Sequence, residues 1–495
     1  MPRELLQFPK DTIQIEMVMN NKKTSRFHSS RISRRYFVAG ACVASIFSII
    51  PRRLLGGTGH VPPSETVNIA VIGTGGQGTV NIKNLLRQED ARIIAIADPN
   101  EESDYSQFYY RGTAGRKPAL KLINDFYRQK DSPTNFKECT PYIDFRKMFD
   151  EEKGIDAVLI ATPDHVHAVA TMAAISRGKH VYCEKPLAHS VYEVRKVTEA
   201  AHQAGVATQM GNHGHSGEGI RLTCEWIWDG AIGPIREVHA WTGGSSRFPV
   251  DERPKETPPV PAGLEWDLWL GPALYRPYHP YYHPYTWRNW WAFGTGGIGD
   301  MGCHNIDPAF WALRLGSPLS VETINTQVSK EVTPHGSTIK YEFPPRGDLP
   351  AVTLTWYDGN HRVPRPEDLD TKRRLDGNGI LFIGEKGTML CGGWGGSPRL
   401  IPESKMKEYQ RPNKTLPRSQ GHHRDWIDAC KGGKPASANF DYAGPLTEMV
   451  LLGNVAQRVG EKILWDGNTL KVTNIPKANE YVRSPYRAGW DLNHT

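Results

Sequence analysis

The stretch that most constrains the fold of this 495-residue chain is Val67–Gly78, which reads V-N-I-A-V-I-G-T-G-G-Q-G. It begins with an apolar run of strand length, after which Gly73, Gly75 and Gly78 fit the spacing G-x-G-x-x-G. The first glycine permits a tight turn, the second lets the backbone approach a pyrophosphate, and the third lets the next helix pack against the strand. The positive end of that helix favours phosphate. The stretch therefore predicts a Rossmann dinucleotide site.

A second apolar run, Ala91–Ala97, predicts the next strand of the same sheet and ends at Asp98. An acidic residue at this point suits a ribose diol and repels a 2′-phosphate, which favours NAD over NADP. Gly76 and Gln77, inside the glycine loop, are expected to contact the same cofactor. The alternative is an ordinary buried strand–helix turn, in which the glycines serve packing alone and Asp98 caps a helix.

The positive charge of the chain is concentrated at its N-terminus. The net charge is +7, but residues 1–60 hold ten Lys or Arg against three Asp or Glu, which leaves 50 of each kind for the rest. Because the body of the chain is formally neutral, a nucleic-acid partner is not indicated. A hydrophobic fraction of 39% over this length allows two or three domains with cores of their own.

The N-terminal segment has three parts in a fixed order. Arg34 and Arg35 are followed by the apolar run Val38–Ile50 and then by a further basic pair, Arg52 and Arg53. This order resembles a twin-arginine export signal, and the apolar run is too short to span a membrane stably. We therefore expect residues 1–65 to be a leader and linker, the twin-arginine (Tat) machinery to be a partner, and the protein to be periplasmic or otherwise exported. The alternative is a basic tail with a chance arginine pair.

Strands and helices alternate from the glycine loop to Gly211, which is typical of a parallel, doubly wound sheet. The expected strands are Ile155–Ala161, His180–Cys183 and Val206–Met210, and the expected helices are Ala119–Gln129, Ala168–Arg177 and Ser190–Ala204. We assign residues 66–211 to this NAD(P)-binding Rossmann domain.

Beyond Gly211 the expected strands are longer and helices are scarcer. The strands are Ile235–Trp241, Val321–Val328, Ser337–Phe343, Ala351–Tyr357 and Ile380–Ile383, and two helices, His423–Lys431 and Leu446–Glu461, close the chain. This texture predicts a second, α+β domain over residues 212–495, with a mainly antiparallel sheet and helices on one face. Pro249–Gly294, rich in proline and aromatic residues, is expected to form an ordered excursion over the active-site cleft.

Cysteine and histidine spacing does not predict a metal site. The cysteines are scattered without C-x-x-C spacing, so neither a zinc ribbon nor a dense disulfide framework is indicated. Six histidines lie near predicted loops, but no carboxylate completes a two-histidine facial set with them. They are His165, His167, His213, His215, His422 and His423. We therefore expect no catalytic metal.

Four motifs occur in a characteristic order. They are G-T-G-G-Q-G at Gly73–Gly78, A-T-P-D-H-V-H at Ala161–His167, C-E-K-P-L-A at Cys183–Ala188 and G-G-I-G-D-M-G-C-H-N-I-D at Gly296–Asp307. From about Val67 to Asp466 the chain resembles the glucose–fructose oxidoreductase/inositol dehydrogenase (Gfo/Idh/MocA) family. The resemblance implies a Rossmann domain, a second domain with an open-faced antiparallel sheet, nicotinamide between them, a sugar or polyol substrate, and a homodimer or homotetramer.

Three residues carry the expected chemistry. Oxidising an alcohol requires removal of the hydroxyl proton, so Lys185 suits a developing alkoxide and a proton relay, and Glu184 can orient it. Asp300 and His304 are four residues apart and would share one face of a helix. His304 can act as acid or base near neutral pH while Asp300 orients it or a substrate hydroxyl. The resemblance assigns catalysis to the same trio; the alternative for the last two is a helix N-terminus with a capping aspartate.

Further site residues follow from the resemblance and from residue type. Beside the cofactor we expect Thr162, Pro163, His167, Glu184, Lys185, Asn212 and Arg288, and at the substrate His213, His215, Trp287 and Asp307. Trp287 can offer a flat apolar face to a sugar ring, although packing is an equal alternative for any one aromatic residue. The run His213–His215 departs from the basic-aromatic run more usual in the family, which leaves the substrate open.

The sequence supports three hypotheses of function. The first is an exported NAD-dependent oxidoreductase that oxidises a hydroxyl of a sugar, polyol or glycoside. Its cofactor would be tightly bound and recycled, because the twin-arginine route carries folded, loaded proteins to places without an assured NAD supply. The second is a redox-neutral NAD-dependent glycoside hydrolase that acts through a transient 3-keto sugar. The third, a non-catalytic sugar-binding protein, predicts loss of Lys185 or His304, and both are present.

Overall fold

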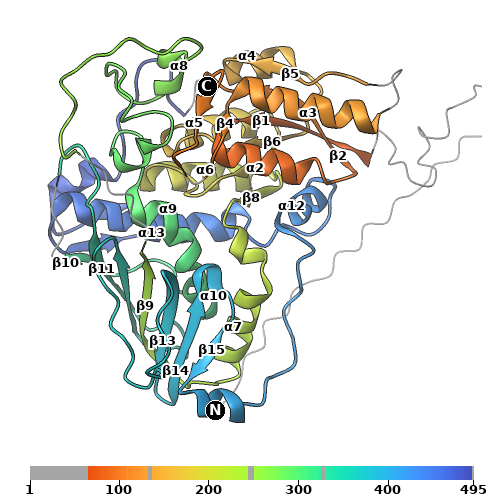
Figure 1. The fold of residues 1–495 in the computed structure, drawn as a ribbon. Coiled ribbons are helices and arrows are strands. Elements are labelled where there is room, and N and C mark those ends of the chain that lie inside the picture. The colour runs from red at the N-terminus through yellow and green to blue at the C-terminus, as the bar shows by residue number, and fades with distance from the viewer. Residues whose placement is uncertain (1–64, 109, 132–135, 244–249, 325–328, 493–495) are drawn as a thin grey trace, which may run out of the picture. The chain divides into compact units, whose positions relative to one another are not determined.

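Six parallel strands form the doubly wound sheet predicted for the N-terminal half (Figure 1). In spatial order they are β5 (Thr140–Tyr142), β2 (Ala91–Ala97), β1 (Val67–Ile72), β6 (Ala157–Ile160), β7 (His180–Cys183) and β8 (Thr208–Met210). The structure, a computed structural model, describes residues 65–108, 110–131, 136–243, 250–324 and 329–492. Apart from Glu65, the predicted export leader of residues 1–65 lies outside them.

Helices cover both faces of this sheet. One face packs on α2 (Gly76–Leu85) and α3 (Arg116–Lys130), and the other packs on α4 (Phe145–Glu151), α5 (Asp164–Ile175) and α6 (Val191–Ala204). Helix α6 begins with a reciprocal capping box between Ser190 and Glu193 and ends at Gly205 in the left-handed conformation, as its sequence pattern predicts. Helix α5 begins at Asp164, four residues earlier than expected, so most of the A-T-P-D-H-V-H motif is helical.

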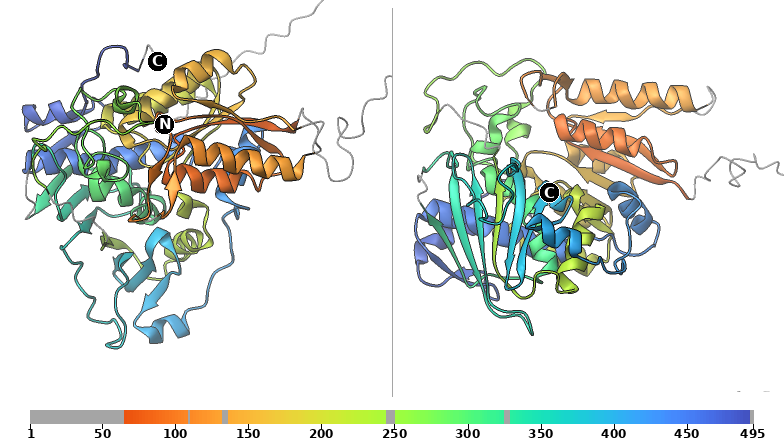
Figure 2. Two further views of the ribbon diagram at one scale, coloured as in Figure 1. Left: turned by 45° about the horizontal axis from the view of Figure 1, so that its top comes forward. Right: turned by 60° about the horizontal axis from the view of Figure 1, so that its bottom comes forward.

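The second sheet is mainly antiparallel, as predicted, and it is built from nine strands (Figure 2). In spatial order they are β15 (Arg399–Ile401), β14 (Gly387–Gly392), β13 (Asn378–Gly384), β9 (Ile235–Thr242), β12 (Val352–Asp358), β11 (Ser337–Phe343), β10 (Ser320–Ile324), β16 (Ile463–Asp466) and β17 (Lys471–Val472). Strands β9 and β12 pair in parallel. The last part of the expected strand Val321–Val328 lies outside the described residues.

One face of this sheet is covered by α7 (Glu218–Trp228), α9 (Gly296–Asn305), α10 (Asp307–Ala312) and α13 (Phe440–Val459). Helix α13 starts six residues before the predicted Leu446, because Asn439 caps it and Pro445 is accommodated inside the helix. The other face is covered over β9, β13 and β15 by the segment 359–377, whose Leu369 joins Trp241, Leu381 and Ile401 in a small apolar cluster.

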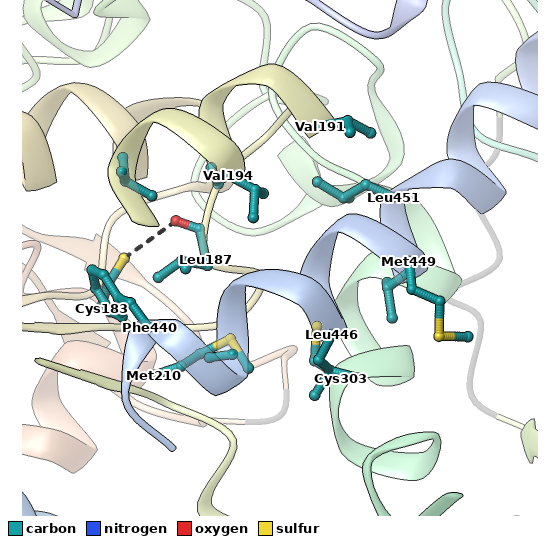
Figure 3. Close-up of a cluster of buried hydrophobic side chains, with 14 of the residues drawn as sticks. Cys183, Leu187, Val191, Val194, Met210, Cys303, Phe440, Leu446, Met449 and Leu451 are labelled. Atoms are coloured by element: carbon teal, nitrogen blue, oxygen red, sulfur yellow. Dashed lines mark hydrogen bonds between the residues drawn. The ribbon is translucent and has the colours of Figure 1, made fainter. Parts of the chain in front are cut away.

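Helix α13 joins the two sheets into one core. It packs against α6 of the Rossmann domain and against α9 of the second domain. Figure 3 shows this junction, where Val191 of α6 faces Leu451 of α13, and Leu446 of α13 lies beside Cys303 of α9. Because the contact is apolar and continuous, it holds the Rossmann domain, with its glycine loop, in a fixed position relative to α9. The distance between residues of the glycine loop and residues of α9 follows from this packing.

Two further segments reach the Rossmann sheet from the C-terminal part. Helix α12 (His422–Cys430) places Trp426 and Ile427 in the core beneath α2 and α3. The expected excursion is described from residue 250 and contains α8 (Trp266–Leu270) and a 3-10 turn, η4 (Thr286–Asn289). Its aromatic side chains form a cluster of their own, which includes Trp290 and Phe293.

The remaining elements are short. They are the hairpin strands β3 (Ser103–Asp104) and β4 (Thr113–Ala114), helix α11 (Glu403–Glu408) and the 3-10 turns η3 (His213–Ser216), η5 (Gly393–Gly395) and η6 (Pro476–Tyr481). In the described part of the chain, no helix is both long and apolar enough to cross a membrane.

Candidate active site

A deep cleft opens where the strands of the Rossmann sheet end, and the excursion forms its opposite wall. Its empty volume, with the open mouth included, is about 1130 Å³. Twelve of the predicted site residues line it: Gly73, Gly75, Gly76, Gln77, Asp98, Thr162, Pro163, Glu184, Lys185, Trp287, Arg288 and Asp300. The structure therefore brings together most of the residues that the sequence assigned to cofactor and catalysis.

The glycine loop is shaped as its spacing predicts. Gly73 has φ of 86°, and a Cβ there would lie 2.6 Å from the backbone of Ala161. A Cβ on Gly78 would lie 2.1 Å from the carbonyl oxygen of Gly73, so this glycine packs behind the loop and does not line the cleft. Helix α2 begins at Gly76, and its first amides have no partners within the helix. A pyrophosphate fits this cradle.

Aromatic residues of the β3–β4 hairpin lie over the glycine loop. The Tyr105 hydroxyl is 2.9 Å from the position of a Cβ on Gly75, and the Tyr110 ring is 2.0 Å from that of a Cβ on Gly76. The Tyr110 hydroxyl donates to Gln77 Oε1 at 3.1 Å. These contacts exclude side chains at both glycines and narrow the mouth of the cleft.

The hairpin also meets the excursion. The Phe108 ring stacks on the Tyr285 ring, with centroids 4.6 Å apart and planes 17° apart. Backbone contacts support the same approach, since Glu101 N donates to Gly263 O at 2.8 Å. We call Tyr105, Phe108, Tyr110 and Tyr285 the aromatic clasp. It joins the two walls of the cleft above the glycine loop.

Asp98 lies at the end of β2, as predicted, and its carboxylate is held from inside the loop. Asp98 Oδ2 accepts hydrogen bonds from Thr74 N at 2.7 Å and Thr74 Oγ1 at 3.0 Å, and Oδ1 accepts one from Asn100 N at 2.9 Å. Burial raises the pKa of Asp98, although these hydrogen bonds oppose the rise. Oδ2 already accepts two hydrogen bonds, whereas Oδ1 accepts one and keeps a lone pair for a ribose hydroxyl. The Arg116 guanidinium donates to the Asp98 carbonyl, so a cation also stands nearby.

The centre of the site is an ion pair between the two domains. Lys185 Nζ, just after β7, is 2.6 Å from Asp300 Oδ1 on α9. Arg288 forms a second ion pair with the same carboxylate, with its Nε 3.8 Å from Asp300 Oδ1. The rings of Trp287 and Tyr285 flank the Arg288 guanidinium. Burial would raise the pKa of Asp300, but Lys185 and Arg288 outweigh it and lower that pKa to about 2.

The pKa of Lys185 shifts the other way. Burial acts to lower it, and the Asp300 and Glu184 charges more than compensate, so the pKa rises above its usual value. Lysine is therefore protonated and aspartate ionised across the working pH range. An ammonium held in this way can donate to a developing alkoxide, and it is not a general base.

His304 lies one turn after Asp300 on α9, as predicted, but it is buried. Its exposed fraction is 8%, and burial, with the nearby Lys185 charge, lowers its pKa to about 3. The pKa of His304 thus lies below the near-neutral value expected from the sequence, because the site removes water from the imidazole. Its Nδ1 is buried without a hydrogen-bond partner in the described structure. A neutral imidazole with a nitrogen that has no hydrogen-bond partner is suited to a substrate hydroxyl.

The Glu184 carboxylate is hydrogen-bonded to side chains of α2. Its Oε1 accepts hydrogen bonds from Asn81 Nδ2 at 2.8 Å and Gln77 Nε2 at 3.2 Å, and His213 Nε2 lies 3.6 Å away. Burial acts to raise the pKa of Glu184, but His213, Lys185 and Asn81 hold it well below its usual range. His213, predicted at the substrate, therefore lies beside Glu184 and does not line the cleft itself.

Asn212, His215 and Asp307 form a buried network outside the cleft. Asp307 accepts from Asn212 Nδ2 at 2.9 Å, from His215 Nδ1 at 3.0 Å and from the Tyr442 hydroxyl at 2.5 Å, and no more than 1% of any of the three predicted residues is exposed. Asp307 does not continue the face of Asp300 and His304, because α9 ends at Asn305. The geometry gives a structural role to His215 and Asp307; Asn212 Oδ1 remains buried without a partner.

His167 also lies behind the cleft wall. Its ring bonds the carbonyl oxygens of Pro186 at 2.7 Å and Thr162 at 3.0 Å, so it ties together the two loops that carry Thr162, Pro163 and Lys185. His422 and His423 likewise bond protein groups, Met210 O and Asn81 Oδ1. Within the described ranges, no group of three His, Cys, Asp or Glu side chains has the geometry to hold a metal ion. The six described cysteines are free thiols.

Three features of the site were not predicted from the sequence. The first is the part of the aromatic clasp contributed by residues 105–110, a segment in which no motif was recognised. The second is Asp164, which lines the cleft and accepts a hydrogen bond from Thr295 Oγ1 at 2.6 Å, at the start of α9. The third is Trp394, whose ring centroid lies 5.8 Å from that of His304. The glycine pairs on both sides of this tryptophan were a usable signal.

Family profiles match both halves of the chain. Residues 67–212 match the Gfo/Idh/MocA profile described as an oxidoreductase family with an NAD-binding Rossmann fold. Residues 236–346 match the profile described as the C-terminal alpha/beta domain of that oxidoreductase family. Together the two profiles cover just over half of the chain.

Among characterised proteins, the chain is similar to a 2,7-anhydro-N-acetylneuraminate hydratase of Mediterraneibacter gnavus. The two are 27% identical over 180 residues, which are 36% of this chain and 40% of that protein. An inositol 2-dehydrogenase of Rubrobacter xylanophilus is 29% identical over 143 residues, 29% of this chain and 33% of that protein. The match thus spans less than half the length of either relative.

Among solved structures, the fold is similar to that of the WlbA dehydrogenase from Chromobacterium violaceum, determined in complex with NADH and UDP-GlcNAcA. The TM-score is 0.55 at 16% identity, and the alignment covers 81% of this chain and 97% of that one. At this identity the likeness concerns the fold alone. It extends over both domains.

Proposed function

We propose, since the chain belongs to the Gfo/Idh/MocA family of oxidoreductases, that it oxidises a hydroxyl of a sugar, polyol or glycoside with a retained NAD. The observation that carries this proposal is the Lys185–Asp300 ion pair, 2.6 Å long, at the end of the glycine-loop cleft, with the unpartnered Nδ1 of His304 one helical turn further on. A cation that stabilises an alkoxide and a neutral base are the two groups that alcohol oxidation requires from the protein.

When bound, a nicotinamide dinucleotide supplies the hydride acceptor. The protein's own groups then have distinct tasks. Lys185 donates a hydrogen bond to the hydroxyl oxygen as negative charge develops there, and Asp300 holds the ammonium in place. His304, neutral at pH 7, accepts the hydroxyl proton. Arg288, held between two aromatic rings, keeps Asp300 ionised.

The cofactor is NAD in this proposal because Asp98 presents its carboxylate at the end of β2, where a ribose diol would lie. A 2′-phosphate would meet a negative charge there. Arg116 donates to the carbonyl oxygen of Asp98, and its positive charge could attract a 2′-phosphate. The choice between NAD and NADP is therefore decided by experiment.

Retention of the cofactor is supported by the aromatic clasp. Tyr105 and Tyr110 lie over the glycine loop, and Phe108 meets Tyr285 across the mouth of the cleft. A dinucleotide bound beneath them would have to part these rings to leave. Retention agrees with the proposed export through the twin-arginine pathway, for which the support is the ordered leader around Arg34 and Arg35.

A second candidate is a redox-neutral reaction at the same site. In it the sugar is oxidised at C3, the acidified C2–H is removed, the glycosidic bond is broken by elimination, water adds, and the hydride returns to C3. A hydratase among the similar proteins favours this candidate, as does a retained cofactor, which needs no external acceptor in a closed cycle. The non-catalytic alternative ranks last because Lys185, Asp300 and His304 are assembled in one site.

The first experiment measures the cofactor. Purified protein is denatured, and released dinucleotides are separated and identified by mass spectrometry. Near-stoichiometric NAD supports the proposal, and NADP would correct the cofactor. A protein that releases neither, and that binds neither when it is added, would refute both enzymatic candidates.

The second experiment separates the two enzymatic candidates. Sugars, polyols and nitrophenyl glycosides are added to the loaded protein while absorbance at 340 nm and nitrophenol are recorded. Reduction of bound cofactor that persists until an external keto-sugar acceptor is added favours the oxidoreductase. Nitrophenol release without net reduction favours the redox-neutral hydrolase.

A further inference from the structure

Trp394 has a backbone conformation that bulky residues rarely adopt. It lies in the 3-10 turn η5 with φ of 57° and ψ of 24°, the left-handed region, between Gly392–Gly393 and Gly395–Gly396. Such a conformation is strained for a residue with a large side chain, and it persists only when the surroundings enforce it. A glycine at this position would carry no such strain.

The surroundings of Trp394 do enforce it. Its backbone N–H donates to Asn305 Oδ1 at 3.1 Å, and Asn305 Nδ2 in turn donates to the carbonyl oxygen of Trp241 at 2.8 Å. On the other side, a Cβ on Gly214 would lie 2.6 Å from the Trp394 Cβ, so only glycine allows this approach. The end of α9, strand β9 and the turn η3 thus fix the backbone and the Cβ of Trp394 in one place.

Trp394 is nevertheless 45% exposed, whereas Trp287, Trp290 and Trp291 are at most 7% exposed. Its ring stands edge-on to His304, with centroids 5.8 Å apart and planes 64° apart. His304 is one turn beyond Asp300, which pairs with Lys185. The ion pair, the imidazole and the indole therefore follow one another from the dinucleotide cleft toward the second domain.

We propose that Trp394 is the platform on which the apolar C–H face of a pyranose or cyclitol ring stacks while its reacting hydroxyl lies at Lys185 and His304. This inference rests on the proposed function and adds to it a residue that recognises the substrate, which would be a six-membered ring with axial C–H groups on one face. An indole suits such a face because it is large, flat and apolar, and it retains an N–H to donate to a ring hydroxyl. The proposal also explains why a strained backbone is retained at Trp394, because this backbone conformation places the side chain beside His304.

The test compares Trp394→Gly with Trp394→Phe and with Trp228→Ala. Glycine removes the ring and relieves the backbone strain, so loss of binding cannot be ascribed to a misfolded turn. Trp228, on α7, is similarly exposed, at 42%, and serves as the matched control. Binding of methyl β-D-glucopyranoside, methyl α-D-galactopyranoside and myo-inositol to the NAD-loaded protein is followed by saturation-transfer NMR with irradiation of the aromatic protons.

For the probe that binds wild type best, we expect Trp394→Gly to raise Kd about tenfold or more. Transfer to the protons on one face of the probe should disappear, while bound NAD and thermal stability are retained. Phenylalanine should give an intermediate value, and the Trp228 control should match wild type. A Trp394→Gly Kd within twofold of wild type would overturn the platform.

Two other outcomes are equally informative. If wild type retains NAD but binds none of the three probes, the platform is overturned while the cofactor part of the proposed function stands. If light scattering shows that Trp394→Gly changes the oligomeric state and leaves probe binding unchanged, the exposed indole is an interface between copies, and the platform is again overturned.

Discussion

Two aspartates of one sequence motif, on neighbouring helices, differ in how far their carboxylates are buried and saturated with hydrogen bonds. Asp300 on α9 meets Lys185 in the cleft and keeps 34% of its side chain exposed. Asp307 on α10 meets His215, Asn212 and Tyr442, and its side chain is 2% exposed. Both are acidic groups paired with basic ones at similar distances. Only the first retains an open side toward a ligand, and this openness distinguishes a site for chemistry from a network that holds the fold.

The largest expected effect is the loss of stability on Asp307→Ala. Removing the carboxylate leaves His215, Asn212 and Tyr442 buried without their partner, which should cost about 3–5 kcal/mol of the free energy of unfolding. Urea unfolding followed by tryptophan fluorescence measures the cost. Asp300→Ala is the matched control and should lose activity with a much smaller loss of stability. Equal losses of stability would remove the distinction between the two sites.

The next effect concerns activity. Lys185→Ala should lower turnover about 10²–10³-fold, because a preorganised donor to the developing alkoxide is removed. The released-cofactor assay should still find NAD, since the glycine loop is intact. The measurement is single-turnover reduction of bound cofactor by whichever sugar reduces the wild type. Wild-type rates in this variant would contradict the assigned role.

The third effect is a pH dependence of stability. The pKa of His304 is lowered to about 3, so the unfolded chain takes up its proton near pH 6.5 and the folded chain does not. Stability must therefore fall as the pH is lowered from about 6.5 toward 3. His304→Gln should reduce the slope of the free energy of unfolding against pH by at most about 1.4 kcal/mol per pH unit, which corresponds to one proton.

The His304 prediction is checked by urea unfolding of wild type and variant between pH 4 and 7. His283, also buried with a pKa lowered to about 3, provides a control outside the ion pair. His283→Gln should flatten the pH dependence of stability in the same way. An unchanged slope for His304→Gln would show that the imidazole is not kept neutral by the fold.

The smallest effect is that of the aromatic clasp. Phe108→Ala and Tyr285→Ala, alone and combined, should each speed dissociation of NAD, with a coupling of about 0.5–1.5 kcal/mol between them. Dilution of loaded protein into a coupled assay for free NAD measures the dissociation rate. Additive effects in the double variant would show that the stacked pair does not close the cleft.

The first sheet was predictable because its signals are local. The apolar runs of β1 and β2 and the spacing of Gly73 and Gly78 are written in consecutive residues, and short-range sterics dictate what they form. The capping box at Ser190 is equally local. The short strand β5 of this sheet and the short strands β15, β16 and β17 of the second sheet carry too few residues for a pattern. They were found only in the structure, as was the six-residue β14.

The sequence by itself determined the dinucleotide fold, the order of the two domains and the grouping of Lys185, Asp300 and His304. Tertiary structure alone decided which polar residues remain open. In the folded protein the Asp307 carboxylate accepts hydrogen bonds from three donors, and the Glu184 carboxylate accepts one from Asn81. Burial also lowers the pKa of His304. The tertiary structure also placed the clasp and Trp394 at the site from distant segments. Burial and hydrogen-bond saturation depend on partners far along the chain, and local sequence spacing does not encode them.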